Sequence, residues 1–182
     1  LLRSSGRWAD SVVMVLADHA MDWSHPHRMV SLMPVLEDDP MLTGRVQVAQ
    51  NGGAHLLYWT GPSAGREAAV RRMRSLVADV PGVLSVHVPG VLGLGARAGD
   101  LVVYCRAGWR FSDPQQVSNP IPGTHGHPAT APIPFFIAGG SPRVRPGEVS
   151  SRPVSTVDVA PTVGSVLGLS APVAGYDGAA LL

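Results

Sequence analysis

A continuous apolar segment that stops at an acid and a histidine constrains the fold of this chain more than any other feature. Residues 11–16 read Ser-Val-Val-Met-Val-Leu, and Ala17, Asp18 and His19 follow directly. An apolar run without polar alternation is typical of a strand buried on both faces, as in the parallel sheets of α/β proteins. Ligands of open α/β sheets bind beyond the carboxyl ends of the strands. The sequence therefore favours an α/β fold with a site at Asp18 and His19.

A glycine-rich histidine loop repeats this pattern later in the chain. Residues 122–128 read Pro-Gly-Thr-His-Gly-His-Pro, and a second apolar segment, residues 133–138, follows them. The glycines on either side of His125 permit backbone conformations that other residues avoid. Carboxylate and imidazole groups from separate segments are ligands for zinc, so Asp18, His19 and His125 are candidates for one divalent-metal site. The competing interpretation makes Asp18 a helix cap and both histidines ordinary surface residues.

Length and charge narrow the class of protein. A chain of 182 residues with 45% hydrophobic and 15% charged residues is long enough and apolar enough to bury a core. A net charge of +1 gives no reason to expect a nucleic-acid-binding surface or an anionic membrane as partner. Cys105 is the single cysteine, which excludes an intrachain disulfide and favours a buried, inert thiol. No apolar run reaches the length of a transmembrane segment.

The chain is organised in three blocks. Residues 1–34 hold the first apolar strand, residues 43–107 have the pattern of a small α+β insertion, and residues 108–182 return to the main sheet. Asn51-Gly52 predicts a hairpin turn within the insertion. Alternation and apolar runs predict the order β-β-α-β-β, with strands at 45–50, 55–59, 83–88 and 100–105 and a helix at 65–80.

Two helices have recognisable ends in the sequence. Ser63 is a plausible cap for the helix of the insertion, and Pro81-Gly82 ends it. The last helix is expected to begin at Asp158 as N-cap, with Pro161 in its first turn, and to end at Gly168. Apolar residues at helical spacing are expected to face the core: Val70, Met73, Leu76, Val77 and Val80 in the first helix, and Val159, Val163, Val166 and Leu167 in the second.

Other polar groups are weaker candidates. His127 precedes a proline that turns the chain, and His25 and His27 flank Pro26 in what reads as an exposed loop. Arginines on the inserted helix predict a solvated face rather than a phosphate site: Arg66, Arg71, Arg72 and Arg74. Arg106 and Arg110 could approach an anionic substrate. The glycine-rich residues 90–95 lie between two strands, whereas a dinucleotide-binding loop must open a helix.

Three segments together resemble the alkaline phosphatase superfamily, and within it the nucleotide pyrophosphatase/phosphodiesterase-like branch. Residues 13–21 look like the segment that carries an Ala-Asp-His-Gly-Met motif, and residues 123–126 look like the second metal-histidine loop. Residues 156–169 look like the helix that begins Asp-Ile-Ala-Pro-Thr. The resemblance implies that residues 1–182 are the C-terminal part of one domain with a mainly parallel, three-layer sheet, into which residues 43–107 are inserted.

The resemblance also implies a chemistry. Asp18 and His19 match the pair that binds the metal ion activating a Thr or Ser nucleophile, and His125 matches the last ligand of a second ion. Two divalent ions are implied, zinc by analogy with manganese as the alternative. The implied substrates are small phosphodiesters or nucleotides, cleaved at a phosphodiester or pyrophosphate bond.

Two departures from the family pattern bear on this expectation. Ala20 stands where the family has Gly, which removes no ligand. The nucleophile and the remaining ligands precede the Ala-Asp-His segment in the family, and nothing in residues 1–17 matches them. We therefore expect this chain to be inactive alone and its parent to be the enzyme. The alternatives are another hydrolase of the superfamily (phosphomonoesterase, sulfatase or phosphonoacetate hydrolase) or a metal-binding module without turnover, and the compartment stays open.

Overall fold

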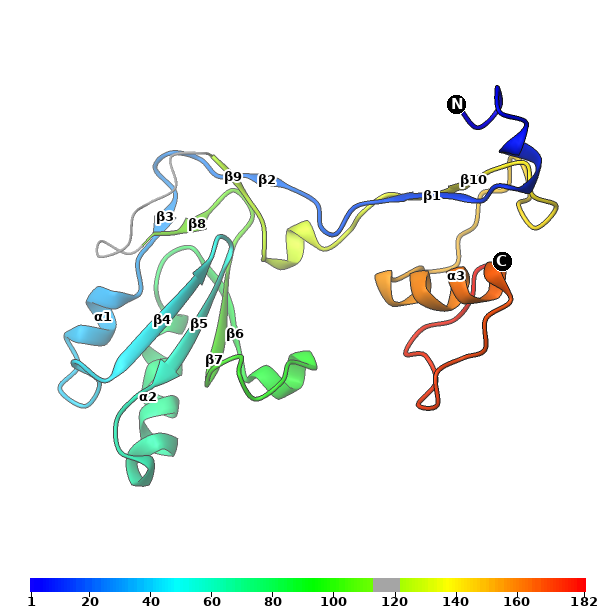
Figure 1. The fold of residues 1–182 in the computed structure, drawn as a ribbon. Coiled ribbons are helices and arrows are strands. Elements are labelled where there is room, and N and C mark those ends of the chain that lie inside the picture. Colours follow the sequence, from blue (N-terminus) through cyan, green and yellow to red (C-terminus); the bar gives the residue numbers. More distant parts are fainter. Residues whose placement is uncertain (113–121) are drawn as a thin grey trace. The chain divides into compact units, whose positions relative to one another are not determined.

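The computed structural model describes residues 1–112 and 122–182, which form two compact units (Figure 1). Residues 1–18 and 133–182 make up the first unit, and the second spans residues 19–132. Helices and strands occur in both units, so the chain is of mixed α/β class. No helix of the described residues combines the length and the apolar character needed to cross a membrane.

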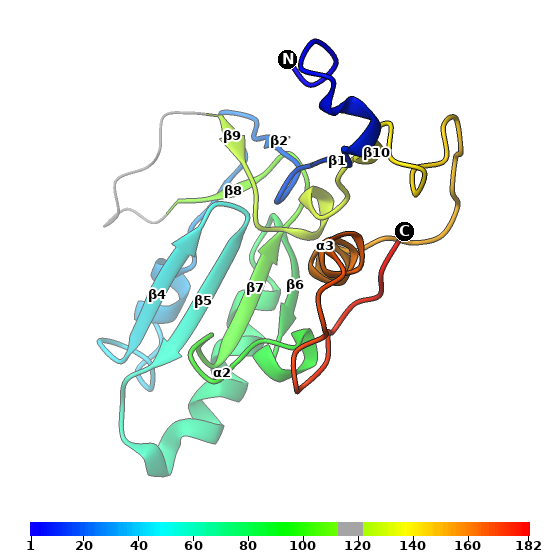
Figure 2. The same ribbon diagram turned by 45° about the vertical axis from the view of Figure 1, so that its right-hand side comes forward.

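A four-stranded antiparallel sheet with one long helix forms the centre of the second unit (Figure 2). The strand order is β4-β5-β7-β6, and helix α2 packs against β5, β6 and β7. The bounds are β4 Val46–Asn51, β5 Ala54–Trp59, α2 Arg66–Ala78, β6 Val83–His87 and β7 Leu101–Cys105. The predicted order β-β-α-β-β is therefore confirmed.

The hairpin between β4 and β5 turns one residue later than the sequence predicts. Asn51 pairs with Ala54, so the two residues of the turn are Gly52 and Gly53 rather than Asn51 and Gly52. Gly52 has a φ of 57°, the left-handed conformation that hairpin turns of this length require. The tight turn keeps the next strand in register, and Val46 lies opposite Trp59 at the far end.

Helix α2 buries the face that its apolar spacing predicts. Ala69, Met73 and Val77 are fully buried against the sheet, while Val70, Leu76 and Val80 pack beside them. The cap prediction is wrong: Ser63 lies in a 3-10 turn, η2 Ser63–Gly65, and the N-cap of α2 is Gly65, with no side-chain capping hydrogen bond. The helix ends at Ala78, and Gly82, with a φ of 92°, then redirects the chain into β6.

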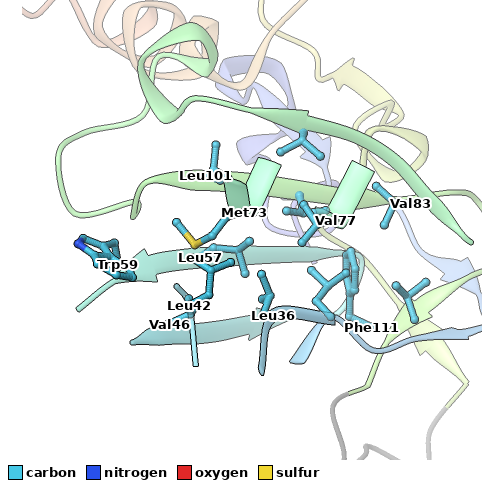
Figure 3. Packing of buried hydrophobic residues seen from close by; sticks show 14 of the residues in the cluster. Leu36, Leu42, Val46, Leu57, Trp59, Met73, Val77, Val83, Leu101 and Phe111 are labelled. Atoms are coloured by element: carbon cyan, nitrogen blue, oxygen red, sulfur yellow. The ribbon is translucent and has the colours of Figure 1, made fainter. Parts of the chain in front are cut away.

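The core of the second unit lies between this sheet and its helices (Figure 3). Leu57 of β5, Leu101 of β7 and Met73 of α2 are each fully buried. Helix α1, Met33–Glu37, adds Leu36 to the same cluster, and Phe111 extends it. Burial of each large apolar side chain stabilises the fold by about 1.5–3 kcal/mol, so this cluster holds the unit together.

Short strands join the remaining segments of the second unit. Strand β2, Asp22–Trp23, pairs antiparallel with β9, Gly123–Thr124. Strand β3, Met29–Val30, pairs parallel with β8, Arg110–Phe111. Two 3-10 turns complete the unit, η3 Pro89–Leu92 and η4 Pro128–Thr130. The segment after His19 is thereby held beside the segment that contains His125.

The first unit contains a two-stranded antiparallel ribbon. Strand β1, Val13–Leu16, pairs with β10, Phe135–Ala138, and the 3-10 turn η1, Arg7–Asp10, precedes it. The expectation that both strands are buried on both faces is wrong within this unit. Val15 and Phe136 lie directly opposite each other and expose 56% and 62% of their surface. With two strands in the ribbon, few neighbouring side chains are present to cover its faces.

The expected mainly parallel sheet is not confirmed. Among the strand pairs of the described residues, β3 with β8 is parallel, and the other pairs are antiparallel. The physical reason is that an apolar run indicates a buried strand but does not indicate whether the paired strand runs parallel or antiparallel to it. The mixed α/β class is confirmed, and β4 and β5 of the α+β segment pair antiparallel as a hairpin.

Helix α3, Val159–Leu167, keeps its predicted ends but turns a different face inward. Pro161 lies in the first turn, and Gly168 ends the helix with a φ of 66°. Ser155 and Asp158 form a capping box across the preceding 3-10 turn, η5 Thr156–Asp158. The predicted stripe is buried only in part: Val159, Val163 and Val166 are half-buried and Leu167 is exposed. The buried residues of the helix are Pro161, Thr162 and Gly164. The C-terminal segment covers this face of the helix, and it is held there by the Leu181 N–H, which donates to Thr162 Oγ1.

Candidate functional site

Two of the predicted metal ligands lie against each other in the second unit. The rings of His19 and His125 stack with their centroids 3.9 Å apart and their planes 12° from parallel. His19 follows Asp18 directly, and His125 lies between β9 and η4. Two imidazoles from distant segments therefore meet at one place in this unit.

Hydrogen bonds orient the ring of His19. Its Nδ1 lies 2.8 Å from the carbonyl oxygen of Ala20. In the neutral ring Nδ1–H donates to that oxygen, so the lone pair is carried by Nε2, the usual arrangement for a ligating histidine. The Ala20 N–H in turn donates to the Thr130 carbonyl at 2.8 Å. Because no described non-glycine residue has a positive φ, alanine at position 20 introduces no backbone strain.

The β4–β5 turn holds the loop of His125. The Gly53 N–H donates to the His125 carbonyl at 2.7 Å. A Cβ at Gly52 would lie 2.6 Å from Thr124 Oγ1, and one at Gly126, whose φ is 103°, would lie 2.6 Å from the Asn51 carbonyl oxygen. These close approaches require glycine, which explains the glycine-rich composition of both loops.

Asp18 belongs to the first unit, whereas His19 and His125 belong to the second. Asp18 is exposed, and it precedes His19 directly in the chain. Within the described ranges, no group of three or more His, Cys, Asp or Glu side chains is arranged to hold a metal ion. The donor chemistry of His19 and His125 fits zinc, and the full set with Asp18 stays a prediction.

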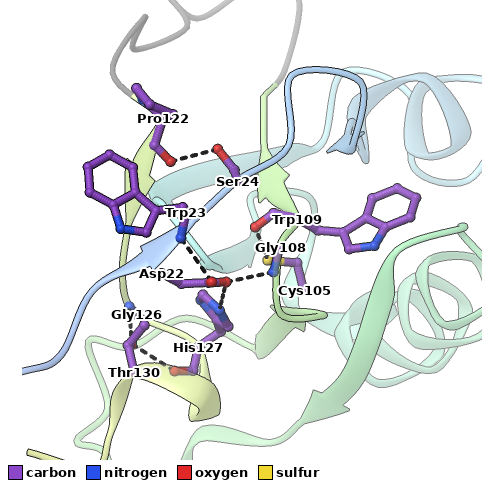
Figure 4. A network of polar contacts seen from close by, with 10 residues as sticks. All are labelled: Asp22, Trp23, Ser24, Cys105, Gly108, Trp109, Pro122, Gly126, His127 and Thr130. Atoms are coloured by element: carbon purple, nitrogen blue, oxygen red, sulfur yellow. Dashed lines mark hydrogen bonds and ion pairs between the residues drawn. The ribbon is translucent and has the colours of Figure 1, made fainter.

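A second pair, which the sequence did not single out, joins the segment that follows His19 to the segment that follows His125 (Figure 4). His127 Nε2 and Asp22 Oδ2 are 2.9 Å apart, and the His127 side chain is fully buried. Burial alone would raise the pKa of Asp22, but hydrogen bonds from the Gly108 N–H, His127 and the Trp23 N–H together hold that pKa below its ordinary value. No spacing rule connects Asp22 with His127, because the contact depends on the pairing of β2 with β9.

The remaining candidates have structural partners. Cys105 is buried, which raises the pKa of its thiol to about 12 and makes it inert at neutral pH, as predicted. Ion pairs along α2 join Arg66 to Asp100, Arg71 to Glu67 and Arg72 to Asp39. Arg106 donates to the Val83 carbonyl and Arg110 contacts Met29. Three of the four arginines of α2 therefore form a solvated, ion-paired face, and Arg74 donates to the Val86 carbonyl.

Comparisons with known proteins show which fold this is. No protein-family model matches the sequence, and no curated protein matches it. Human ectonucleotide pyrophosphatase/phosphodiesterase 5 is similar over 98% of this chain and 46% of its own, with a TM-score of 0.72 and 16% identity. An inactive variant of the murine protein, in complex with AMP, is similar over 93% of this chain and 44% of its own (TM-score 0.66, 15% identity). Phosphonoacetate hydrolase from Sinorhizobium meliloti, in complex with phosphonoacetate, is similar over 81% and 39% (TM-score 0.58, 16% identity).

These likenesses confirm the resemblance read from the three sequence segments at the level of the fold. The neighbours are hydrolases of the alkaline phosphatase superfamily, of the nucleotide pyrophosphatase/phosphodiesterase-like kind. The chain spans less than half the length of each of these solved structures.

Proposed function

We propose that this chain is part of a metal-dependent hydrolase that cleaves phosphodiester or pyrophosphate bonds of small nucleotide-like substrates. The observation that carries the proposal is the stack of His19 on His125, which brings two predicted ligands from distant segments together. The fold shared with hydrolases of this superfamily supports it. Fold alone does not define a reaction, so the site has to carry the assignment.

Each residue has a defined role in this proposal. Asp18 and His19 would bind one divalent ion and His125 a second, with zinc preferred for this donor set and manganese as the alternative. When bound, such ions lower the pKa of a hydroxyl nucleophile and neutralise charge on the reacting phosphoryl group. The bond from His19 Nδ1 to the Ala20 carbonyl presents Nε2 for ligation. The Gly53 N–H fixes the backbone of His125 by donating to the His125 carbonyl.

The nucleophile belongs to the parent protein in this proposal. A Thr or Ser hydroxyl outside residues 1–182 would lose its proton and attack phosphorus, and the bond from phosphorus to the alcohol or phosphate leaving group would break. Water would then hydrolyse the phosphoryl- or nucleotidyl-enzyme and restore the hydroxyl. The AMP complex of the murine neighbour supports a nucleotide as the class of substrate to test first.

One alternative reaction has a specific observation in its favour. The bacterial neighbour is a phosphonoacetate hydrolase in complex with phosphonoacetate. Its likeness makes cleavage of a carbon–phosphorus bond the second candidate, ahead of phosphomonoester or sulfate-ester hydrolysis.

Turnover by the full-length protein distinguishes these candidates. We expect zinc-dependent hydrolysis of bis-p-nitrophenyl phosphate and of a dinucleotide, with phosphonoacetate turned over more slowly. Loss of a residue that supports a metal ligand lowers activity by about 10–100-fold. Loss of the ligand itself should lower it further, so we expect His125→Ala to lose at least about 100-fold in activity. His27→Ala is the control because His27 is an exposed histidine of the same unit. Equal activity of His125→Ala and His27→Ala would overturn the proposal.

A further inference from the structure

We propose that Asp22 and His127 form a positioning pair that fixes the spacing of His19 and His125. This inference rests on the proposed function, because it assigns a role in preparing the same metal site. The pair touches neither metal nor substrate in this proposal. Instead it ties together the two loops that carry the candidate ligands.

The Asp22 carboxylate connects three separate segments of the second unit (Figure 4). Its Oδ2 accepts hydrogen bonds from His127 Nε2 at 2.9 Å and from the Gly108 N–H at 2.6 Å. Its Oδ1 accepts from the Trp23 N–H at 2.9 Å, within its own strand. An ionised carboxylate with several charge-assisted hydrogen bonds holds its partners more firmly than a neutral acceptor does.

The hydrogen bonds of Asp22 fix the tautomer of His127. An ionised carboxylate can only accept, so His127 Nε2 carries a proton, and in the neutral ring the lone pair lies on Nδ1. Nδ1 is buried and has no hydrogen-bond partner among the described residues. It faces Gly53, where an added Cβ would lie 1.9 Å from it. A buried nitrogen without a partner is uncommon in folded proteins and invites a functional explanation, since an apolar ring would fill the same space.

The pair is connected to both candidate ligands by short stretches of backbone. On one side, Asp22 pairs with Thr124, the residue before His125, and the Ala20 N–H binds the Thr130 carbonyl. On the other side, Thr130 Oγ1 accepts from the Gly126 N–H at 3.1 Å and donates to the His127 carbonyl at 2.9 Å. A rotation of either loop would break the Asp22–His127 bond. The bond therefore opposes separation of the His19 and His125 rings.

Two pairs of variants of the full-length protein separate positioning from simple stability. Asp22→Ala and His127→Phe remove the bond, and His127→Phe keeps an aromatic ring in the space. Asp22→Asn and His127→Gln each retain a group that can make the bond, and they serve as conservative rescues. Cobalt alone is the probe, because its visible spectrum reports ligand geometry and its titration gives affinity. Thermal unfolding in chelator measures stability separately.

We expect Asp22→Ala and His127→Phe to lose about 10–100-fold in cobalt affinity with an altered visible spectrum, and the rescues to stay close to the wild type. Variants that lower only the unfolding temperature, with affinity and spectrum unchanged, would overturn the positioning role while the proposed function stands. If one bond-removing variant does not fold, the other decides.

A measurement on metal-free protein tests the positioning role even where the proposed function fails. If wild-type protein takes up no cobalt, the proposed function fails. The ring ¹⁵N resonances of His19 and His125 in metal-free protein then decide the positioning role. A shift or broadening of both in Asp22→Ala, with recovery in Asp22→Asn, supports it, and unchanged resonances overturn it.

Discussion

His19 and His125 stack at 3.9 Å although the four-stranded sheet and helix α2 lie between them in the sequence. The pairing of β2 with β9 makes this possible, because it brings the segment after His19 beside the segment before His125. The α+β segment thus lies, in the sequence, between the two segments that carry the candidate ligands. The stability of that segment therefore bears on the geometry of the site.

Replacing Leu57 tests the core of this segment. Leu57 is fully buried on β5, and Leu57→Ala should lower the free energy of unfolding by about 2–5 kcal/mol, because it leaves a cavity among neighbours that cannot fully collapse. Leu84→Ala on the exposed face of β6 is the matched control, with an expected change within about 0.5 kcal/mol. Urea unfolding measures both, and equal losses would contradict the placement of the core.

Replacing Gly53 tests the packing of the β4–β5 turn on His127. A Cβ at this position would lie 1.9 Å from His127 Nδ1, so Gly53→Ala must displace the ring or the turn. Overpacking of this kind costs about 1–3 kcal/mol. Gly90→Ala is the control because an added Cβ there meets nothing within 4 Å. A Gly53→Ala variant as stable as Gly90→Ala in urea unfolding would show that the ring lies elsewhere.

Cys105 supplies a test by chemical modification. Its thiol is buried and its pKa is raised to about 12, so very little thiolate exists at pH 8. We expect no reaction with a disulfide reagent in the native protein at pH 8, and one thiol to react per chain in denaturant. Rapid reaction of native protein would contradict the burial of this strand.

Asp158 predicts a dependence of stability on acid pH. Hydrogen bonds from the Ala179 and Ser155 N–H groups hold the pKa of Asp158 below its ordinary value. A lowered pKa means that the ionised form stabilises the fold above about pH 4, and that this contribution is lost as pH falls through the lower, folded-state pKa. The stability difference between wild type and Asp158→Asn should therefore be largest near neutral pH and shrink toward acid. A pH-independent difference in thermal unfolding would contradict it.

The sequence predicted the elements that depend on local patterns. Strong alternation and Gly/Pro punctuation located the α+β segment, and Gly168 ended α3 where expected. The turn moved by one residue because Gly53 as well as Gly52 accepts the conformation of a hairpin turn. The buried face of α3 was missed because the C-terminal segment that covers it follows no period.

Contacts between distant segments could not be predicted. Asp22 and His127 are joined by the register of two strands of two residues each, which are too short to show a pattern in the sequence. An apolar run likewise does not indicate that β1 pairs antiparallel with β10. Asp18, His19 and His125 came instead from their position next to apolar segments and from the resemblance to a known family, and the structure brings the two histidines together.

The metal content of the full-length protein tests the role of His19 and His125 most directly. Wild type and the His125→Ala and His27→Ala variants would be dialysed without chelator and measured by elemental mass spectrometry. We expect two zinc ions per chain in wild type and in His27→Ala, and loss of one ion in His125→Ala, as a two-metal site requires. Full metal content in His125→Ala would contradict the assignment of His125 as a ligand.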